Sequence, residues 1–247
     1  MSRFYYHPAL VEAETISLSR EESRHLKANR IEPGATVQLT DGKGNLFSGI
    51  VSDNSSQLAR IEILKKNVII EENYKFWVWQ PLLKNWSRLD WLIEKLSEVG
   101  VSGIGLFRSE RCIREKIPLQ RKERWEKIII EACKQSGRTS FPPLVIAENW
   151  DHFLVLCHQY DMDRVVGDPN SSSPLWNYLI AKTPPFNIQL IVGPEGDFSF
   201  QEKEHLQALA ETRFIKFSSS ILRSETASLF GAMVCIAGLE SKRESRH

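Results

Sequence analysis

Two strand-like runs near the carboxyl end of the chain each end in a turn that opens onto a helix-like run. They are Ile191-Val-Gly-Pro-Glu-Gly-Asp-Phe-Ser199 and Ile221-Leu-Arg-Ser-Glu-Thr-Ala-Ser228. Repeated strand–turn–helix units predict an open α/β sheet, and such sheets bind ligands at the carboxyl ends of their strands. The two motifs therefore bring backbone N–H groups, a carboxylate and a guanidinium to the place where a ligand is expected.

The first turn is predicted to be a shaped loop. Gly193 and Gly196 permit close approach of another group to the backbone, and Pro194 between them fixes φ. Ser199, followed by Glu202, predicts a capping box at the start of the next helix.

From Tyr74 onward, short apolar runs alternate with longer amphipathic ones, which predicts a largely parallel sheet covered by helices on both faces. The expected strands are Phe76–Gln80, Gly103–Phe107, Leu144–Ala147, Arg164–Gly167, Ile188–Val192 and Phe214–Phe217. The expected helices span residues 86–99, 119–136, 150–159, 201–211 and 225–240. The last of these is apolar almost all round, which indicates burial either inside the domain or against a second subunit.

Residues 1–72 have a different pattern. Short β-like runs, separated by turn signals, lie at Thr15–Leu18, Thr36–Thr40, Leu46–Val51 and Leu58–Leu64. One helical run, Arg20–Arg30, interrupts them. Many short strands with tight turns predict a small β-barrel. The acidic stretch Glu71-Glu72-Asn73 is the expected domain boundary.

The net charge of +1 is unevenly distributed along the chain. Residues 73–140 carry 14 basic and 8 acidic side chains, whereas the segments before and after them have net charges of −1 and −4. The basic residues gather at Arg108, Arg111, Arg114, Lys116, Arg121, Lys122, Arg124 and Lys127. Such a patch can bind phosphates in a salt-dependent manner. Because glutamates are interleaved with it, a solvated helix face is the alternative.

Several classes of protein are disfavoured by the sequence. The cysteines at positions 112, 133, 157 and 235 show neither disulfide pairing nor metal-ligand spacing, which fits a reducing cytoplasm. No run is long and apolar enough to cross a bilayer, and the first residues lack the apolar core of a signal peptide. A dinucleotide fingerprint, a phosphate loop and a nucleophile elbow are also lacking. We therefore expect a cytoplasmic protein with no metal and no membrane partner.

The two C-terminal motifs, in this order, resemble those of the RsmE family. That family has a Gly-Pro-Glu-Gly-Gly-Phe-Ser loop, a Leu-Gly turn and then Ile-Leu-Arg-Thr-Glu-Thr-Ala. The resemblance extends over most of the chain. It includes His25-Leu26, Arg30, Gly34, Asp41-Gly-Lys-Gly44, Lys84, Arg88, Glu94-Lys95, Glu98-Val-Gly-Val101, Glu110-Arg111, Arg124-Trp125 and Glu131-Ala-Cys-Lys-Gln-Ser-Gly-Arg138.

This resemblance implies a fold and an activity. RsmE enzymes are uridine N3-methyltransferases of 16S ribosomal RNA and belong to the SPOUT class, whose α/β domain contains a trefoil knot and forms homodimers. By resemblance, residues 1–72 are a PUA-like RNA-binding β-barrel and residues 73–247 a SPOUT methyltransferase domain. The implied cofactor is S-adenosylmethionine. The implied partner is 16S rRNA or the small ribosomal subunit.

Three turns would form the cofactor pocket, again by resemblance: one at Gly167, the glycine loop, and the turn from Phe217 to Leu222. The implied cofactor-binding residues are Gly167, Ile191, Gly193, Pro194, Glu195, Gly196, Phe217, Ser218, Ser219, Ile221 and Leu222. A plain strand–helix connection is the alternative interpretation of the glycine loop.

Methyl transfer from a sulfonium mainly requires alignment of the acceptor nitrogen, the methyl carbon and the sulfur. Uracil N3 also carries a weakly acidic proton, so the proton must be removed or the anion stabilised. Glu195 is the candidate acceptor of that proton, and Arg223 is the candidate for stabilising negative charge on the flanking carbonyl oxygens. The alternative for Arg223 is a structural ion pair with Glu225 at the start of the last helix.

The implied RNA-binding residues are Arg30, Lys84, Arg88, Arg111 and Arg138. Lys84 and Arg88 follow the strand expected at residues 76–80. Gly137 is expected to end the helix before Arg138, so Arg138 either contacts RNA or satisfies the last carbonyls of that helix.

The chain departs from the family pattern at three positions near the expected pocket. Asp197 stands in place of the second glycine of the loop, where it would either change the charge near a cationic cofactor or cap the following helix. Ser218 replaces the glycine of the Leu-Gly turn, and Ser224 replaces threonine while keeping the hydroxyl.

The resulting hypothesis is an S-adenosylmethionine-dependent methyltransferase acting at N3 of a uridine in 16S rRNA. One rival is a catalytically inactive rRNA-binding assembly factor of the same fold, which the departures at Asp197 and Ser218 would favour. A second rival is an α/β enzyme that acts on a small molecule in the same pocket. It leaves the barrel-like segment and the basic segment unexplained.

Overall fold

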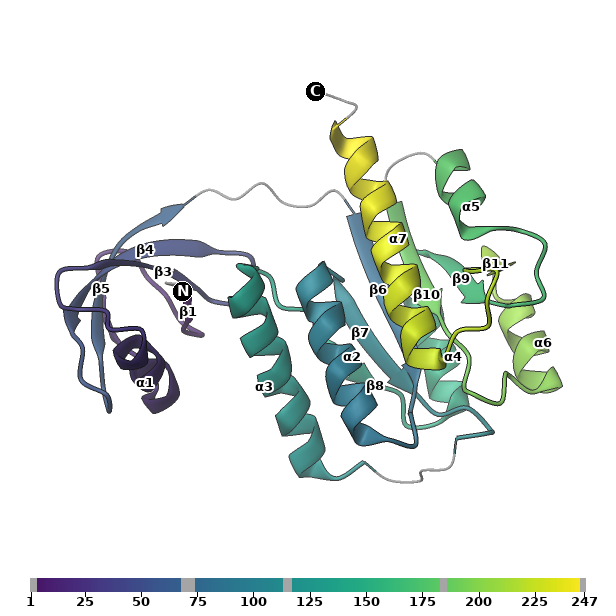
Figure 1. Ribbon diagram of the computed structural model, residues 1–247, viewed down its shortest axis with the longest axis horizontal. Coiled ribbons are helices and arrows are strands. Elements are labelled where there is room, and N and C mark those ends of the chain that lie inside the picture. The colour runs from purple at the N-terminus through teal and green to yellow at the C-terminus, as the bar shows by residue number, and fades with distance from the viewer. Residues whose placement is uncertain (1–3, 68–73, 113–116, 183–185, 245–247) are drawn as a thin grey trace. The chain divides into compact units, whose positions relative to one another are not determined.

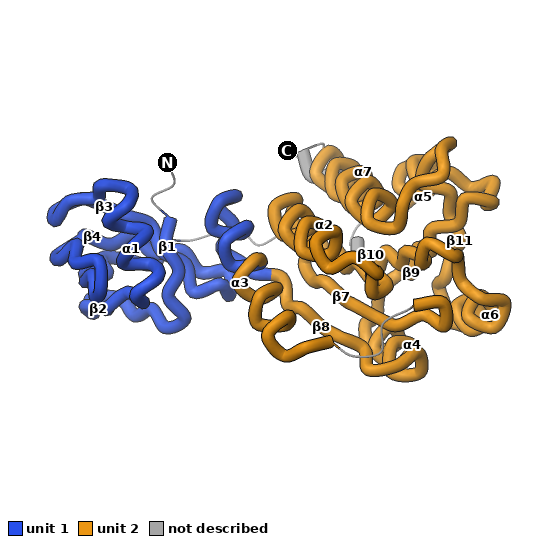
Figure 2. The backbone as a smooth tube through the Cα atoms, turned by 60° about the horizontal axis from the view of Figure 1, so that its bottom comes forward, with its two compact units in different colours: residues 1–71, 129–141 blue, residues 72–128, 142–247 orange. Residues whose placement is uncertain are grey.

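The computed structural model describes residues 4–67, 74–112, 117–182 and 186–244. The chain forms two compact units, residues 1–71 with 129–141, and residues 72–128 with 142–247 (Figure 2). The grouping of residues 129–141 with the first unit is not anticipated by the sequence patterns. The expected domain boundary, residues 71–73, and the basic residues Arg114 and Lys116 lie outside the described residues. The two units divide between residues 71 and 72.

The first unit is built on a five-stranded sheet with the order β1-β3-β4-β5-β2, an open half-barrel with β1 and β2 at its edges. The strands are β1 (Phe4–Tyr6), β2 (Thr15–Ser17), β3 (Thr36–Thr40), β4 (Leu46–Asp53) and β5 (Arg60–Asn67), and helix α1 (Arg20–Ala28) follows β2. β1 pairs with β3 in parallel, and the other ladders are antiparallel. Every one of these elements except β1 is predicted by the sequence patterns.

Alternate residues of the first sheet point into one apolar core. Val37 and Leu39 of β3 and Ile61 and Ile63 of β5 are almost fully buried there, as expected for the two-residue period of a strand. Leu26 of α1 packs into the same core. Helix α1 therefore covers the sheet of its own unit.

The second unit contains a six-stranded sheet with the order β11-β9-β10-β6-β7-β8. All of its ladders are parallel, which confirms the sequence prediction. Its strands are β6 (Tyr74–Pro81), β7 (Gly103–Phe107), β8 (Leu144–Ile146), β9 (Asp163–Gly167), β10 (Phe186–Ile191) and β11 (Thr212–Ile215). The carboxyl ends of parallel strands meet at one edge of a sheet, so the connections that follow them lie close together.

Helices cover both faces of this sheet. They are α2 (Trp86–Val99), α4 (Trp150–Gln159), α5 (Leu175–Ala181), α6 (Phe200–Ala208) and α7 (Ser224–Glu244), while α3 (Leu119–Ser136) contributes to both units. Figure 1 shows α2, α5 and α7 on one face and α4 and α6 on the other. The short helix α5 is not predicted by the sequence patterns.

Local residues set the ends of several helices. The Asn85 side chain accepts a hydrogen bond from the first turn of α2, and Gly100 ends that helix with a φ of +106°. Ser199 and Glu202 form the expected capping box of α6. Gly137, at a φ of +74°, ends α3 as expected, and the next N–H donates to the Cys133 carbonyl.

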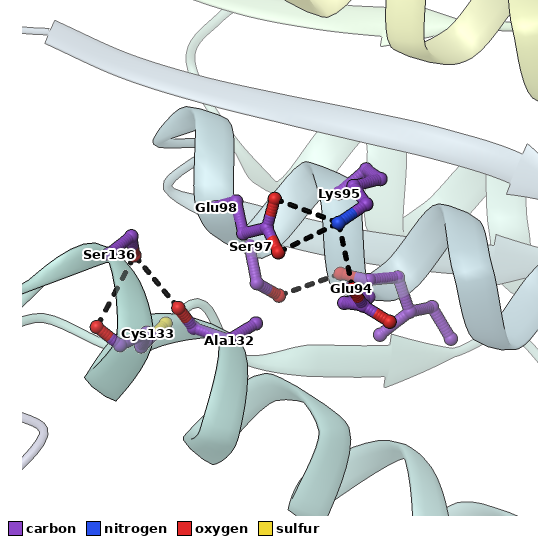
Figure 3. Close-up of polar contacts among 8 residues, drawn as sticks. Glu94, Lys95, Ser97, Glu98, Ala132, Cys133 and Ser136 are labelled. Atoms are coloured by element: carbon purple, nitrogen blue, oxygen red, sulfur yellow. Dashed lines mark hydrogen bonds and ion pairs between the residues drawn. The ribbon is translucent and has the colours of Figure 1, made fainter. Parts of the chain in front are cut away.

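Polar side chains on α2 and α3 make bonds within their own helices (Figure 3). Lys95 Nζ lies 2.7 Å from Glu94 and 2.9 Å from Glu98, which raises the pKa of Lys95. The Ser97 hydroxyl donates to the carbonyl oxygen of Ile93 at 2.8 Å, and the Ser136 hydroxyl donates to that of Ala132, also at 2.8 Å. These contacts stabilise helices and assign no function to the residues that make them.

Two tryptophans of β6 lie over two glycines of β7. The register pairs Trp77 with Gly103 and Trp79 with Gly105. A Cβ atom added at Gly103 would lie 2.2 Å from the Trp77 ring, and one at Gly105 would lie 2.1 Å from the Trp79 ring. The glycines therefore make the space in which these aromatic rings pack between the sheet and α4.

We expect Gly105→Ala to lower the free energy of unfolding by about 1–3 kcal/mol, because the added methyl group must displace a fully buried ring. Urea unfolding of the variant measures this cost. Gly238→Ala is the matched control, since its Cβ would make only ordinary contact, 3.4 Å from Leu179, and alanine favours a helix. Equal effects of the two substitutions would contradict the steric explanation.

Candidate functional site

The turns that follow β9, β10 and β11 surround a cavity of about 380 Å³. Of the residues predicted to bind a cofactor, those in its lining are Gly167, Gly193, Pro194, Glu195, Phe217, Ser218, Ile221 and Leu222. Arg223 lines it as well. Ile191, Gly196 and Ser219 are not in the lining: Ile191 is fully buried in β10, and the other two are exposed on the turns.

The turn after β11 packs directly on the turn after β9. A Cβ atom added at Gly167 would lie 2.9 Å from the Phe217 ring, so only glycine permits this approach. Gly231 of α7 is similarly close to Leu190 and Phe217. The walls of the cavity are therefore held against each other by close packing.

Asp197 adopts a left-handed conformation, with a φ of +63°, which is the conformation that favours the glycine of the family pattern. The Asp197 side chain offsets part of the cost of this backbone conformation. One carboxylate oxygen accepts a hydrogen bond from the Phe198 N–H at 2.8 Å, and the other pairs with Lys203 at 2.6 Å. Asp197 also lines the cavity. The structure thus gives this carboxylate a role at the start of α6, where a lysine neutralises its charge.

Ser218 carries no comparable backbone strain. Within the described ranges, the residues other than glycine with positive φ are Ala13, Arg30, Asp197 and Glu211. The Ser218 hydroxyl accepts from the N–H of Ser220 at 3.2 Å and so stabilises the turn. A serine can therefore replace the family's glycine here without distorting the chain.

Arg223 and Glu195 both have exposed side chains at the cavity. Glu225 is buried, and its salt bridge is to Arg88, with 3.5 Å between Nη1 and Oε1. No salt bridge of Arg223 is found within the described part of the chain. The structural pairing of Arg223 with Glu225 is therefore wrong, because Arg88 of α2 takes that place.

The connection after β7 lies against the glycine loop. Glu202 is almost fully buried and accepts from the Glu110 N–H at 2.8 Å and the Ser109 hydroxyl at 3.0 Å. The Arg111 guanidinium donates to the carbonyl oxygen of Gly196. Burial raises the pKa of the Cys112 thiol, and the nearby carboxylates of Glu195 and Glu202 raise it further. The capping box thus also positions a basic loop beside the cavity.

The residues predicted to bind RNA are divided between the two units. Lys84 is exposed between β6 and α2, and Arg88 and Arg111 contact residues next to the cavity. Arg30 and Arg138 belong to the first unit. Arg138 is half-buried near the Cys133 thiol, whose pKa burial raises to about 11 despite the guanidinium.

Sequence patterns missed several residues around the cavity. Pro169, Val192 and Ala227 line it, and Gln80 lies behind it, whereas Ser220, which also lines it, belongs to the predicted turn from Phe217 to Leu222. Gln80 carried a usable signal, since it is a polar residue at the carboxyl end of an apolar strand run.

Among the described residues, no group of three or more His, Cys, Asp or Glu side chains is arranged to hold a metal ion. None of the described helices combines the length and the apolar character needed to span a bilayer.

Comparison with known proteins identifies the family. A ribosomal RNA small subunit methyltransferase E of Buchnera aphidicola is 28% identical over 224 residues, covering 87% of each chain. Its namesake from Bacillus subtilis is 26% identical over 228 residues, covering 89% of this chain and 88% of the other. The structure of such an enzyme from Neisseria gonorrhoeae, bound to S-adenosyl methionine, is 27% identical, with a TM-score of 0.83 over 98% of both chains. That match covers both the half-barrel and the α/β domain. Since residues 71–235 also match the model of the RNA methyltransferase domain, the chain belongs to that family.

Proposed function

We propose that this protein transfers the methyl group of S-adenosylmethionine to N3 of a uridine in 16S ribosomal RNA. The observation that carries the proposal is the cavity at the carboxyl ends of β9, β10 and β11, with Arg223 and Glu195 at its wall. The Buchnera and Bacillus relatives act on small-subunit rRNA according to their names, and the Neisseria structure holds the methyl donor.

The residues present fit this cofactor. A cavity of about 380 Å³ lies within the range of small-molecule sites. Its turns offer main-chain N–H and C=O groups at Gly193, Ser218 and Leu222, which would hold adenine and ribose, while Asp197 is neutralised by Lys203. S-adenosylmethionine supplies an activated methyl group there. The chain's own contribution is therefore to hold the reactants in line.

Arg223 and Glu195 have complementary roles in this proposal. The guanidinium of Arg223 stabilises negative charge on the carbonyl oxygens beside N3, as a donor placed where charge develops. Glu195 accepts the N3 proton, since this exposed residue also lines the cavity. The salt bridge of Glu225 to Arg88 supports these roles, because it leaves Arg223 available to the substrate.

RNA would be bound by basic residues of both units. In the second unit these are Lys84, Arg88 and Arg111, and in the first unit they are Arg30 and Arg138. We propose that residues 1–72 act as the PUA-like RNA-binding domain and that residues 73–247 form the methyltransferase domain. Phosphate contacts of this kind predict binding that weakens steeply with salt, whereas an enzyme acting on a small molecule would show no such dependence.

The proposal is tested by mass mapping of 16S rRNA from cells lacking this protein. Loss of one N3-methyluridine is expected, and its retention would refute the substrate assignment. Titration calorimetry with S-adenosylhomocysteine separates the enzyme from an inactive assembly factor, because only the enzyme is expected to bind that product. The contacts of the Asp197 carboxylate and of the Ser218 hydroxyl stabilise these turns, which weakens the case for the inactive factor.

We propose further that the protein is a cytoplasmic homodimer whose α/β domain contains the trefoil knot of its class. Support for the dimer comes from α7, which buries Cys235 and Leu239 in its own unit yet exposes Phe230 at 40% and Met233 at 53%. Trp91, 42% exposed, lies on α2, which packs beside α7. These side chains offer an apolar surface to a second copy.

Met233→Glu is expected to weaken dimerisation by about 100-fold, because a self-complementary interface would bury the new charge twice. Light scattering coupled to size-exclusion chromatography measures the change in mass. Val155→Glu is the matched control, since Val155 is 64% exposed on α4, at the opposite face of the sheet. A wild-type monomer, or a dimer unaffected by Met233→Glu, would contradict the proposed interface.

A further inference from the structure

Gln80 is a fully buried polar side chain at the carboxyl end of β6. Burial of an amide is costly unless its hydrogen bonds are made. Nε2 donates to the Pro81 carbonyl at 3.1 Å and to the Ser224 hydroxyl at 2.9 Å, while Oε1 accepts from the Ser228 hydroxyl at 2.5 Å. Both amide protons and one acceptor site are therefore used.

The direction of these hydrogen bonds follows from their partners. The Pro81 carbonyl can only accept, so the amide nitrogen faces it and Oε1 faces Ser228. The carbonyl of Gly193 also can only accept, so the Ser224 hydroxyl donates to it, at 2.7 Å. The chain of donors therefore runs from Ser228 through Gln80 and Ser224 to Gly193.

This series of hydrogen bonds joins two walls of the cavity. Ser224 is the first residue of α7 and directly follows Arg223, while Gly193 begins the glycine loop that carries Glu195. Nothing in the local sequence connects these segments. One buried amide on a third strand holds the hydroxyl that ties them together.

We propose that Gln80 is a positioning residue for methyl transfer. Acting through Ser224, it sets the separation between the backbone at Arg223 and the glycine loop. This inference rests on the proposed function, because it assumes that the cavity between these walls binds the methyl donor.

Gln189 provides a matched control. It is also a fully buried glutamine, on the neighbouring strand β10. Its amide accepts from Trp79 Nε1 at 2.8 Å and donates to the Cys157 carbonyl at 2.9 Å. These partners belong to the core under α4. Replacement of Gln189 therefore removes buried hydrogen bonds but none that connects the walls of the cavity.

The test measures the Kd for S-adenosylhomocysteine by calorimetry in Gln80→Leu and Gln189→Leu, together with the thermal stability of each. Both variants are expected to be less stable. Only Gln80→Leu is expected to bind more weakly, by about tenfold, the equivalent of roughly one buried hydrogen bond. Equal weakening in both variants would overturn the inference, because affinity would then merely follow stability.

Ser224→Ala removes the tie to Gly193 with a smaller change in the core, and so serves if Gln80→Leu does not fold. It is also expected to weaken binding by about tenfold. The double variant, Gln80→Leu with Ser224→Ala, should bind no more weakly than either single variant, since both substitutions break the same series of hydrogen bonds. Additive losses would overturn the inference. If the wild-type protein itself fails to bind, the proposed function falls and the inference falls with it.

Discussion

Replacement of Arg223 by alanine is expected to lower the rate of methyl transfer by about 10²–10³-fold while leaving the fold intact. The Arg223 side chain is exposed at the cavity, and no salt bridge holds it within the described residues. Its loss therefore removes stabilisation of developing charge rather than a structural contact. Single-turnover kinetics with a labelled methyl donor on 16S rRNA or small subunits measures the rate, and thermal unfolding measures the stability.

Two further variants sharpen this test. Arg223→Lys keeps the positive charge but loses the planar fork of donors, so an intermediate rate is expected. Arg213→Ala removes another exposed arginine of the same unit, at the start of β11, and is expected to leave the rate unchanged. Near-normal turnover in Arg223→Ala would show that this guanidinium does not stabilise the transition state.

Loss of the Lys134 ammonium is expected to have the largest effect on stability. Lys134, near the end of α3, is 2% exposed, and Glu22 of α1 is 4% exposed. Nζ lies 2.5 Å from Glu22 and 2.7 Å from Glu131. The backbone N–H of Tyr6 also donates to the Glu22 carboxylate, at 3.3 Å. One buried ion pair thus joins β1, α1 and the α3 segment of the first unit.

Lys134→Met is expected to lower the free energy of unfolding of the first unit by about 3–5 kcal/mol, because it leaves the Glu22 carboxylate buried without its countercharge. Urea unfolding monitored by circular dichroism measures this loss. The double variant Lys134→Met with Glu22→Leu should recover much of it, since no uncompensated charge remains. Independent, additive losses would contradict the ion-pair explanation.

The same pair predicts a dependence on alkaline pH. Burial by itself disfavours the charge on Lys134, but the carboxylate of Glu22, and then that of Glu131, raise its pKa above the ordinary 10.5. A group whose pKa is higher in the folded state than in the unfolded state stabilises the fold fully at any pH below its unfolded-state pKa. This stabilisation disappears as the pH rises through the folded-state pKa. The difference between wild type and Lys134→Met should therefore be constant at neutral pH and shrink above about pH 10.5.

Most secondary structure could be predicted because its causes are local. In α2, the buried residues Leu89, Leu92 and Leu96 recur at helical spacing, and Asn85 and Gly100 lie directly at the helix ends. The predicted and observed ranges are therefore the same. In the long strands, turn residues and apolar runs marked the ends less exactly: β5 was expected at Leu58–Leu64 and spans Arg60–Asn67.

The two missed elements have causes that lie elsewhere in the chain. β1 has only three residues, and its hydrogen bonds come from β3, where Phe4 pairs with Gln38. Helix α5 has seven residues, and Pro174 before it provides no side-chain cap. Its stability comes instead from packing, with Leu175 and Leu179 buried and α7 beside it.

The candidate site shows the same division. Its loops were found from the sequence because glycine, proline and capping residues are adjacent in the motifs, and the resemblance to a family assigned them a ligand. The alternative that paired Arg223 with Glu225 was wrong, since Arg88, the actual partner of Glu225, lies far from it in the sequence and reaches it only through the packing of α2 against α7.

By itself, therefore, the sequence determined the order of strands and helices, the shaped turns after the strands and the family to which they point. Only the tertiary structure decided which residues of those turns line the cavity, which arginine pairs with Glu225, and how Gln80 ties Ser224 to Gly193. The physical reason is the range of the interactions. Periodicity and turn conformation depend on neighbouring residues, whereas a buried polar group is satisfied by whichever strands and helices the folded sheet brings beside it.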